Sequence, residues 1–122
     1  MYAMESILTS IKKLLGIAED YDNFDADIII HINSVFAILN QLGVGPTRCF
    51  YITDKASLWV DFLEDKMQIE SVKSYVYLKV RLMFDPPQSS AAIESINKMI
   101  SELEWRLNVA SESSGEEENQ NG

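Results

Sequence analysis

The chain has 122 residues, 47% of them hydrophobic, and a formal net charge of −9, which fits one folded domain with a single core. No apolar run approaches the roughly 18 residues of a membrane helix, so no membrane-spanning segment is expected. The acidic balance argues against a duplex-DNA binder, because such proteins place basic groups against phosphates. The single cysteine excludes an internal disulfide and fits a reducing compartment, and the N-terminal residues lack the positive start of an export signal.

Two helices are predicted in the first third of the chain. The first covers about 4–15, where apolar residues recur on one face and Gly16 follows as a stop. The second covers about 26–42, with Asp25 as its N-cap and a Gly-Val-Gly-Pro sequence at its end. Its core face consists of residues spaced three and four apart, namely Ile28, Ile32, Val35, Phe36, Leu39 and Leu42.

A short irregular or extended segment is predicted near 47–55, followed by a short helix near 56–63 that Thr53 or Asp54 can cap. A fourth helix is predicted over 69–84, and the Pro-Pro pair that follows must leave it. This helix is apolar on more than one face, so its extra surface must meet other helices of this chain or a second subunit. Residues 78–82 also alternate between apolar and polar types, which leaves a strand as an alternative there.

A fifth helix is predicted from Ser89 or Ser90 to about Asn108, with 3-4-3-4 spacing of Ile93, Ile96, Ile100, Leu103 and Leu107. Residues 111–122 contain four acids and no base, so they contribute −4 of the charge and leave −5 on the rest. They carry no large apolar group, and we expect a disordered acidic tail. The predicted fold is an all-α bundle of about four to five helices, with a domain over 1–110 and the tail over 111–122.

No set of residues has the pattern of a catalytic or metal site. The acidic loop at 20–25 fails the calcium-loop spacing, since Asp25 stands at the position of the required glycine. One cysteine, Cys49, and one histidine, His31, cannot complete a zinc site, and no third group accompanies them as a nucleophile and base. We therefore predict no catalytic residues, no cofactor, no metal and no enzymatic activity.

Three aromatic side chains lie off the main apolar stripes of their helices. Tyr77 and Phe84 stand beside polar positions of the fourth helix, which include Arg81, and Trp105 lies off the seam of the fifth. Aromatic residues are favoured at interfaces because they bury much area with few rotatable bonds. We therefore predict that Tyr77, Arg81, Phe84 and Trp105 belong to an interface between subunits.

Four blocks of the chain carry a family resemblance: IIIHINSVFAILNQLGVGP at 28–46, WVDFL at 59–63, ESVKSYVYLKVRLMFDPP at 70–87 and ISELEWRLN at 100–108. The chain resembles the small head–tail connector, or adaptor, proteins of tailed phages and prophages, which are also labelled DNA-packaging proteins. The resemblance covers about residues 7–108 and leaves the acidic tail unexplained. It concerns core and interface residues rather than a catalytic motif.

The resemblance implies an all-helical subunit that forms a ring under the portal, completes the head and lets the genome pass to the tail. It implies three kinds of protein partner: further copies of the chain, the portal, and the next head-completion or tail protein. Passing DNA would be bound without sequence specificity, and no membrane is involved. The expected location is the head–tail junction of the virion, after synthesis in the bacterial cytoplasm. The four predicted interface residues would then contact a neighbouring subunit or the portal.

Two other classes of protein compete with a connector. The first is a small acidic helical regulator, or antitoxin-like module, that masks a basic partner. The second is a helix-turn-helix nucleic-acid binder. The fourth helix argues against the second class, since Lys73, Lys79 and Arg81 do not form a continuous basic face.

Overall fold

The computed structural model describes residues 4–121, and the side chains of Lys66 and of residues 112–121 lie outside the described part. Within it the chain forms five helices: α1 (Ile7–Leu14), α2 (Asp25–Gln41), α3 (Trp59–Phe62), α4 (Lys66–Phe84) and α5 (Ser90–Asn121). The β-type pairing found in these residues is an isolated antiparallel bridge between Ser6 and Leu58. The prediction of an all-α fold is confirmed, and the strand alternative for 78–82 is wrong because α4 contains those residues.

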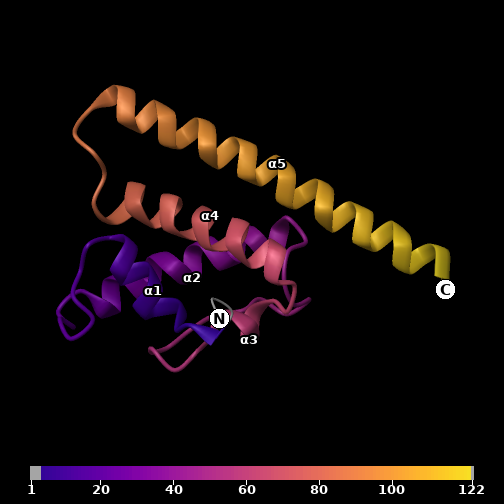
Figure 1. Cartoon of the computed structure of the whole chain (residues 1–122), viewed down its shortest axis with the longest axis horizontal. Helices are drawn as coiled ribbons and strands as arrows, with labels where there is room; N and C mark the ends of the chain where they lie inside the picture. The colour runs from indigo at the N-terminus through magenta and orange to yellow at the C-terminus, as the bar shows by residue number, and fades with distance from the viewer. Residues whose placement is uncertain (1–3, 122) are drawn as a thin grey trace.

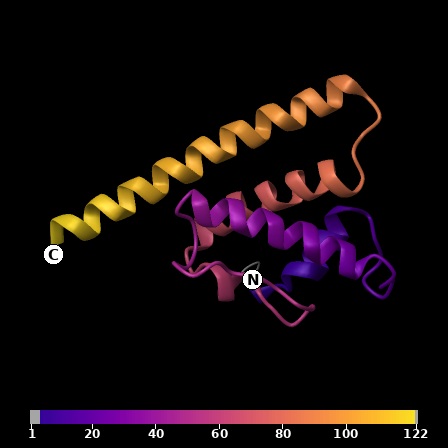
Figure 2. The same cartoon turned by 180° about the vertical axis from the view of Figure 1, so that it is seen from behind.

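The helices α1, α2 and α4 pack against one another, and α5 lies along the outer side of α4 (Figures 1 and 2). α4 is therefore placed between α2 and α5, which explains why its sequence is apolar on more than one face. Val72, Val76 and Val80 are fully buried, and so is Tyr75. Much of the surplus apolar surface of α4 thus meets α5 of the same chain.

An aromatic cluster forms the centre of the core between α2 and α3. The ring of Phe36 lies 4.7 Å from that of Phe62, 5.1 Å from that of Phe50 and 6.3 Å from that of Trp59, measured between ring centroids. Trp59 also donates its indole N–H to the hydroxyl oxygen of Ser10, at 2.8 Å, which joins α3 to α1. Four residues alone cannot form a stable helix. The short helix α3 therefore depends on these contacts with the longer helices.

The irregular segment near 47–55 is confirmed, because residues 47–57 form only bends, turns and unassigned backbone. The predicted helix over 56–63 is shorter than expected and begins only at Trp59. Asp54 accepts a hydrogen bond from the backbone N–H of Ala56, at 2.8 Å, within a turn. At the start of α3, the carboxylate of Asp61 accepts a hydrogen bond from the backbone N–H of Leu58, at 2.8 Å. This bond gives the N–H a partner that the helix itself cannot provide.

Asn33 of α2 holds this irregular segment to the bundle through two hydrogen bonds to one residue. Its side-chain amide donates to the carbonyl oxygen of Ile52 at 2.9 Å, and its side-chain oxygen accepts from the N–H of Ile52 at 2.8 Å. Ile52 is buried, so its backbone groups need partners inside the protein. A single asparagine therefore supplies the pairing that a neighbouring strand would otherwise provide.

The prediction that Asp25 is the N-cap of α2 is wrong by one position. The helix begins at Asp25, and the N-cap residue is Phe24, whose side chain makes no capping hydrogen bond. The Asp25 carboxylate pairs with the ammonium of Lys12 across 2.8 Å. Lys12 is only 2% exposed and also donates to the carbonyl oxygen of Glu19 at 3.0 Å. This lysine thus ties the end of α1 to the acidic loop and to the start of α2.

The boundary predicted between Ala110 and Ser111 falls inside α5, whose backbone continues to Asn121. Ser111 donates its hydroxyl hydrogen to the carbonyl oxygen of Gly43 at 2.9 Å, at the end of α2. The side chains of the rest of the predicted tail lie outside the described residues. The division into a domain over 1–110 and a disordered tail therefore remains a prediction.

Gly45 combines two constraints that exclude a side chain. Its φ angle is +89°, in the region that L-residues rarely adopt, and a Cβ atom there would overlap the ring of Phe62. We expect Gly45→Ala to lower the free energy of unfolding by about 2–4 kcal/mol, from backbone strain and overpacking together. Urea denaturation followed by far-UV circular dichroism measures this loss.

Gly16 provides the matched control for this substitution. Its φ angle is +83°, but nothing lies within 4 Å of the position that its Cβ would take. Gly16→Ala should therefore show only the backbone term, about 1–2 kcal/mol. Equal losses for the two variants would contradict the proposed overlap with Phe62.

Candidate interaction surface

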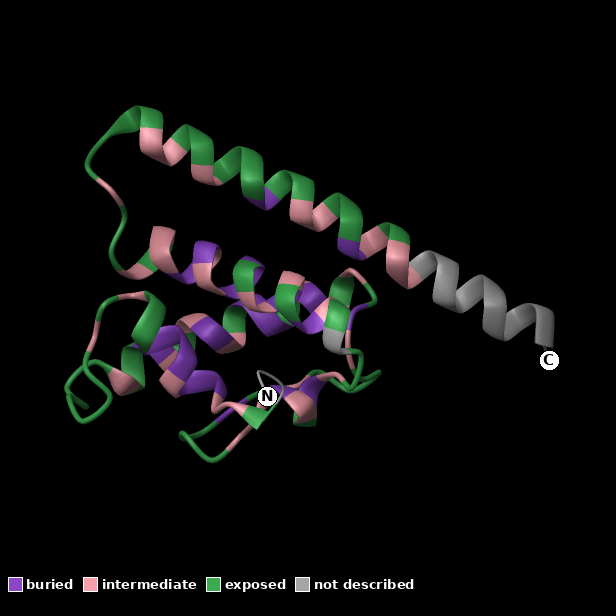
Figure 3. Ribbon diagram, in the orientation of Figure 1, coloured by how far each residue is buried: buried purple, intermediate pink, exposed green. Residues whose placement is uncertain are grey.

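Trp105 is the one aromatic residue in the sequence of α5, and its side chain is 68% exposed. Among the described side chains of this helix, the buried ones are Ile100 and Leu107. Figure 3 shows the buried parts of α5 on the side of the helix that faces α4. At 100° per residue, Trp105 lies on the side of α5 opposite to these two residues. Val109, one turn further, extends the apolar surface on that outer side. The prediction that Trp105 lies off the helix seam is thus confirmed.

Tyr77, Arg81 and Phe84 form a stripe on α4, because they are spaced four and three residues apart. All three are half-buried, and Tyr77 and Phe84 pack against the core. The Nε atom of Arg81 is buried, and no hydrogen-bond partner for it is found among the described residues. These side chains are less accessible than their sequence positions suggest.

Phe84 belongs to a group of aromatic side chains that we call the aromatic corner, made of Tyr21, Phe24 and Phe84. The rings of Phe24 and Phe84 meet edge to face with centroids 5.3 Å apart, and Tyr21 lies 5.5 Å from Phe24. His31 of α2 lies beside the corner, 6.4 Å from the ring of Phe84. Tyr21 and Phe24 remain substantially exposed, so the corner presents apolar surface to solvent.

Sequence reasoning missed Tyr21 and Phe24 as interface candidates. Both lie in the acidic loop, whose carboxylates suggest a calcium site before they suggest an interface. The sequence signal for an interface was the presence of two aromatic residues in a short charged loop, because aromatic residues are enriched at protein–protein interfaces. The partner that holds them, Phe84, is sixty residues away in the chain and could not be paired with them from sequence.

The predicted interface residues therefore lie in two places. Tyr77, Arg81 and Phe84 are on α4, and Phe84 is its last residue, whereas Trp105 is fifteen residues into α5. The two helices run in opposite directions after a short connection (Figure 1). With a rise of about 1.5 Å per residue, Trp105 lies roughly 22 Å along α5 from the end that adjoins Phe84. One surface is thus at each end of the α4–α5 hairpin.

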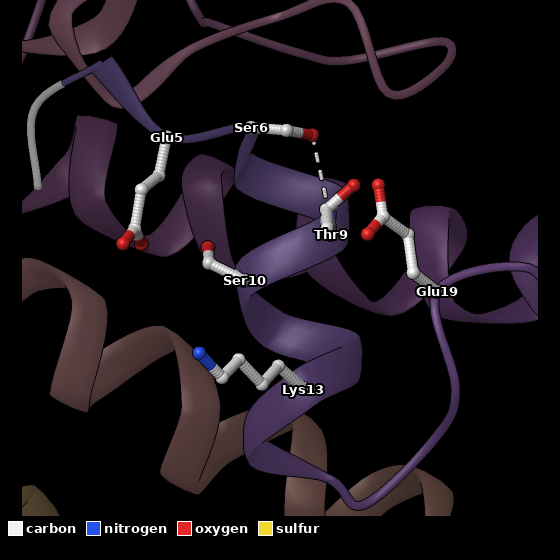
Figure 4. A pocket seen from close by; sticks show the side chains of 6 residues that line it. All are labelled: Glu5, Ser6, Thr9, Ser10, Lys13 and Glu19. Atoms are coloured by element: carbon white, nitrogen blue, oxygen red, sulfur yellow. Dashed lines mark hydrogen bonds between the residues drawn. The ribbon is translucent and has the colours of Figure 1, made fainter.

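A polar cleft of about 330 Å³ lies on α1, and its lining is shown in Figure 4: Glu5, Ser6, Thr9, Ser10, Lys13 and Glu19. Three of these six side chains have partners within the chain. Ser6 accepts from the N–H of Thr9 at 3.2 Å, Ser10 donates to the carbonyl of Ile7 at 3.0 Å, and Glu5 pairs with Lys73 at 2.9 Å. The cleft is therefore better explained by the capping of α1 than by a ligand.

Two observations concern other classes of site. No three histidine, cysteine, aspartate or glutamate side chains gather into a group able to hold a metal ion in the described part of the chain. Among the same residues, no helix is both long enough and apolar enough to cross a membrane. The exposed aromatic side chains are thus the features that call for a partner.

Exposed aromatic surfaces at two separate places are typical of a helical protein that binds other proteins. A family model described as phage connector protein matches residues 7–114, and the chain belongs to this family. The protein is therefore a phage head–tail connector, a virion component that interacts with other head or tail proteins. No curated protein matches the sequence, and no solved structure matches the fold.

Proposed function

We propose that the chain is the repeating subunit of a ring beneath the portal, which completes the head, allows DNA to pass and receives the next protein of the tail. The observation that carries this proposal is the position of its exposed aromatic side chains at opposite ends of the α4–α5 hairpin. A structural role of this kind requires no catalytic group, and we propose that the protein is not an enzyme.

Two different surfaces at two ends favour a head-to-tail contact between copies. In such a contact the Trp105 surface of one subunit would meet the aromatic corner of the next, so that each copy uses both surfaces once. Contacts of this heterologous type produce closed rings when the rotation between copies is suitable, and open filaments otherwise. We propose that the portal holds the first copies in register, so that these contacts between copies form on the portal.

The charge of the protein supports a conduit that DNA does not adhere to. The net charge is −9, and the exposed side chains of the first loop include Glu19, Asp20 and Asp22. A lumen with this charge repels the phosphate backbone, whereas a basic lumen would retain DNA by releasing counterions. We propose that acidic side chains line the channel and that no DNA sequence is recognised.

The substitution Trp105→Ser tests the assembly contact. Because Trp105 is 68% exposed, the variant should keep the helical far-UV spectrum and the stability of the wild type. We expect its affinity for portal-bearing heads that lack this protein to fall at least tenfold, since buried tryptophans are frequent interface hot spots. Co-sedimentation of labelled protein with such heads measures the affinity.

Tyr51→Ser is the matched control, because Tyr51 is an aromatic residue with a similar exposed fraction, 67%, but belongs to the irregular segment at 47–57 rather than to α4, α5 or the aromatic corner. It should bind heads as the wild type does. Phe24→Ser, in the aromatic corner, should reduce binding as Trp105→Ser does. Normal docking of Trp105→Ser would contradict the proposed contact, and a folded protein that instead captured one basic partner in solution would favour the acidic regulator.

A further inference from the structure

The α5 helix contributes few of its own side chains to the core. Among the described residues, twenty buried hydrophobic residues form the core cluster, and α5 supplies two of them, Ile100 and Leu107. The other residues of its seam, Ile93, Ile96 and Leu103, are only partly buried. The remaining eighteen buried residues come from 7–80, so the role of α5 is chiefly to cover one face of α4.

The attachment of α5 depends mainly on α4. Of the first three long helices, α4 is the one on which α5 packs extensively, and both views of the fold show α5 on the outer side of α4 (Figures 1 and 2). A second attachment is the hydrogen bond from the Ser111 hydroxyl to the carbonyl of Gly43. That bond is exposed to solvent, where water can replace it at little cost.

A buried polar group weakens the contact between α4 and α5. Tyr75 is fully buried, and its hydroxyl lies beside the half-buried carboxylate of Glu104 on α5. Burial, the negative charge of Glu104 and a side-chain hydrogen bond to it raise the pKa of Tyr75. That hydrogen bond lies outside standard geometry, because no partner within the usual limits is found for the hydroxyl among the described residues. A buried hydroxyl with such a poor hydrogen bond costs free energy that it recovers when α5 separates and water reaches it.

The connection between the two helices can act as a hinge. The last bond of α4 runs from the N–H of Asp85 to the carbonyl of Arg81, and the first bond of α5 runs from the N–H of Ile93 to the carbonyl of Ser89. Pro86 and Pro87, between them, have no N–H and cannot extend either helix. The two helices are thus separate units joined by a segment that belongs to neither.

We propose that α5 separates from α4 as one unit, about the connection at 85–89, while α1, α2 and α4 stay folded. In the separated state Ile100 and Leu107 become accessible in addition to Trp105. The helix can then contact a neighbouring molecule through its whole circumference rather than through its outer side alone. The proposal rests on the packing of this chain and does not require the ring proposed above.

Hydrogen exchange of the full-length protein, followed by mass spectrometry of peptides, tests the separation. Amides of residues 96–107 should exchange at least tenfold faster than those of 28–39 in α2, because local opening requires less free energy than global unfolding. Low concentrations of urea should accelerate exchange in α2 more than in α5, since local opening exposes less surface. Equal protection and equal urea dependence in the two helices would overturn the proposal.

Two core substitutions distinguish the local from the global event. Leu107→Ala should accelerate exchange at least tenfold in α5 and by a similar factor in α2, because the contacts of Leu107 are lost in local opening and in global unfolding alike. Ile32→Val, in the fully buried face of α2, should accelerate exchange in α2 and leave α5 unchanged, because α2 stays folded when α5 separates. If Ile32→Val accelerated both helices equally, the chain would open as one cooperative unit and the proposal would be wrong.

Tyr75→Phe examines the role of the buried hydroxyl. Removing the poorly bonded hydroxyl should slow the exchange of α5 several-fold and that of α2 by a similar factor, because the group reaches water in local opening and in global unfolding alike. Faster exchange of α5 would show that the hydroxyl holds the helix through Glu104, and it would contradict the weakness assigned to this contact.

Discussion

Phe36→Ala is expected to lower the free energy of unfolding by about 3–5 kcal/mol, the range for removal of a buried phenylalanine. Phe36 is fully buried, and its ring contacts those of Phe50, Trp59 and Phe62. The substitution leaves a cavity at the place where α2 holds α3 and the irregular segment. Since domains of this size are stable by only about 5–15 kcal/mol, a third or more of the stability would be lost. Urea denaturation monitored by far-UV circular dichroism measures the change.

Phe36→Leu serves as the control, because it keeps most of the volume and should cost clearly less than the alanine substitution. The difference in free energy of unfolding between the two variants measures the cost of the cavity, because both variants lose the aromatic contacts. A cost below about 1 kcal/mol for Phe36→Ala would contradict the view that this ring organises the core.

Lys12→Ala is expected to lower the free energy of unfolding by about 2–4 kcal/mol, somewhat less than the loss of a partner from a fully buried ion pair. The substitution removes the partner of the Asp25 carboxylate and the donor to the Glu19 carbonyl. The Asp25 side chain is 30% exposed, so water compensates part of the loss. Urea denaturation of the variant measures the change.

Lys13→Ala is the matched control, because the neighbouring lysine is exposed and should cost less than about 0.5 kcal/mol. A double-mutant cycle with Asp25→Asn should show coupling of at least about 1 kcal/mol between Lys12 and Asp25. Additive losses would mean that Lys12 stabilises the protein through its packing and its bond to Glu19 rather than through the ion pair.

The helices that could be predicted from sequence are those with a long apolar pattern. α2 and α4 have buried residues at the expected three- and four-residue spacings, and Gly16 and Gly43 take the positive φ angles that end helices. α3 was placed with too many residues because its four-residue span is too short to show a period. Its limits depend on Asp61 and on contact with Phe36, which is distant in sequence.

The candidate surface was predicted only in part for the same reason. Trp105 could be identified because the seam of α5 is regular and any residue opposite to it must face outward. Tyr21 and Phe24 could not, because their grouping with Phe84 arises only when the first loop folds beside the end of α4. Tyr21 and Phe24 form an exposed surface together, and neither belongs to a helical pattern from which this surface could be predicted.

The amino-acid sequence by itself determined the all-α class, the C-terminal ends of α1, α2 and α4, and the family to which the chain belongs. These features depend on periodicity, on glycine and proline, and on short blocks of neighbouring residues, all of which are local. The tertiary structure decided that α5 covers the surplus apolar face of α4 and that Lys12 is buried against Asp25. Both depend on which distant segments meet, because burial is a property of neighbours in space.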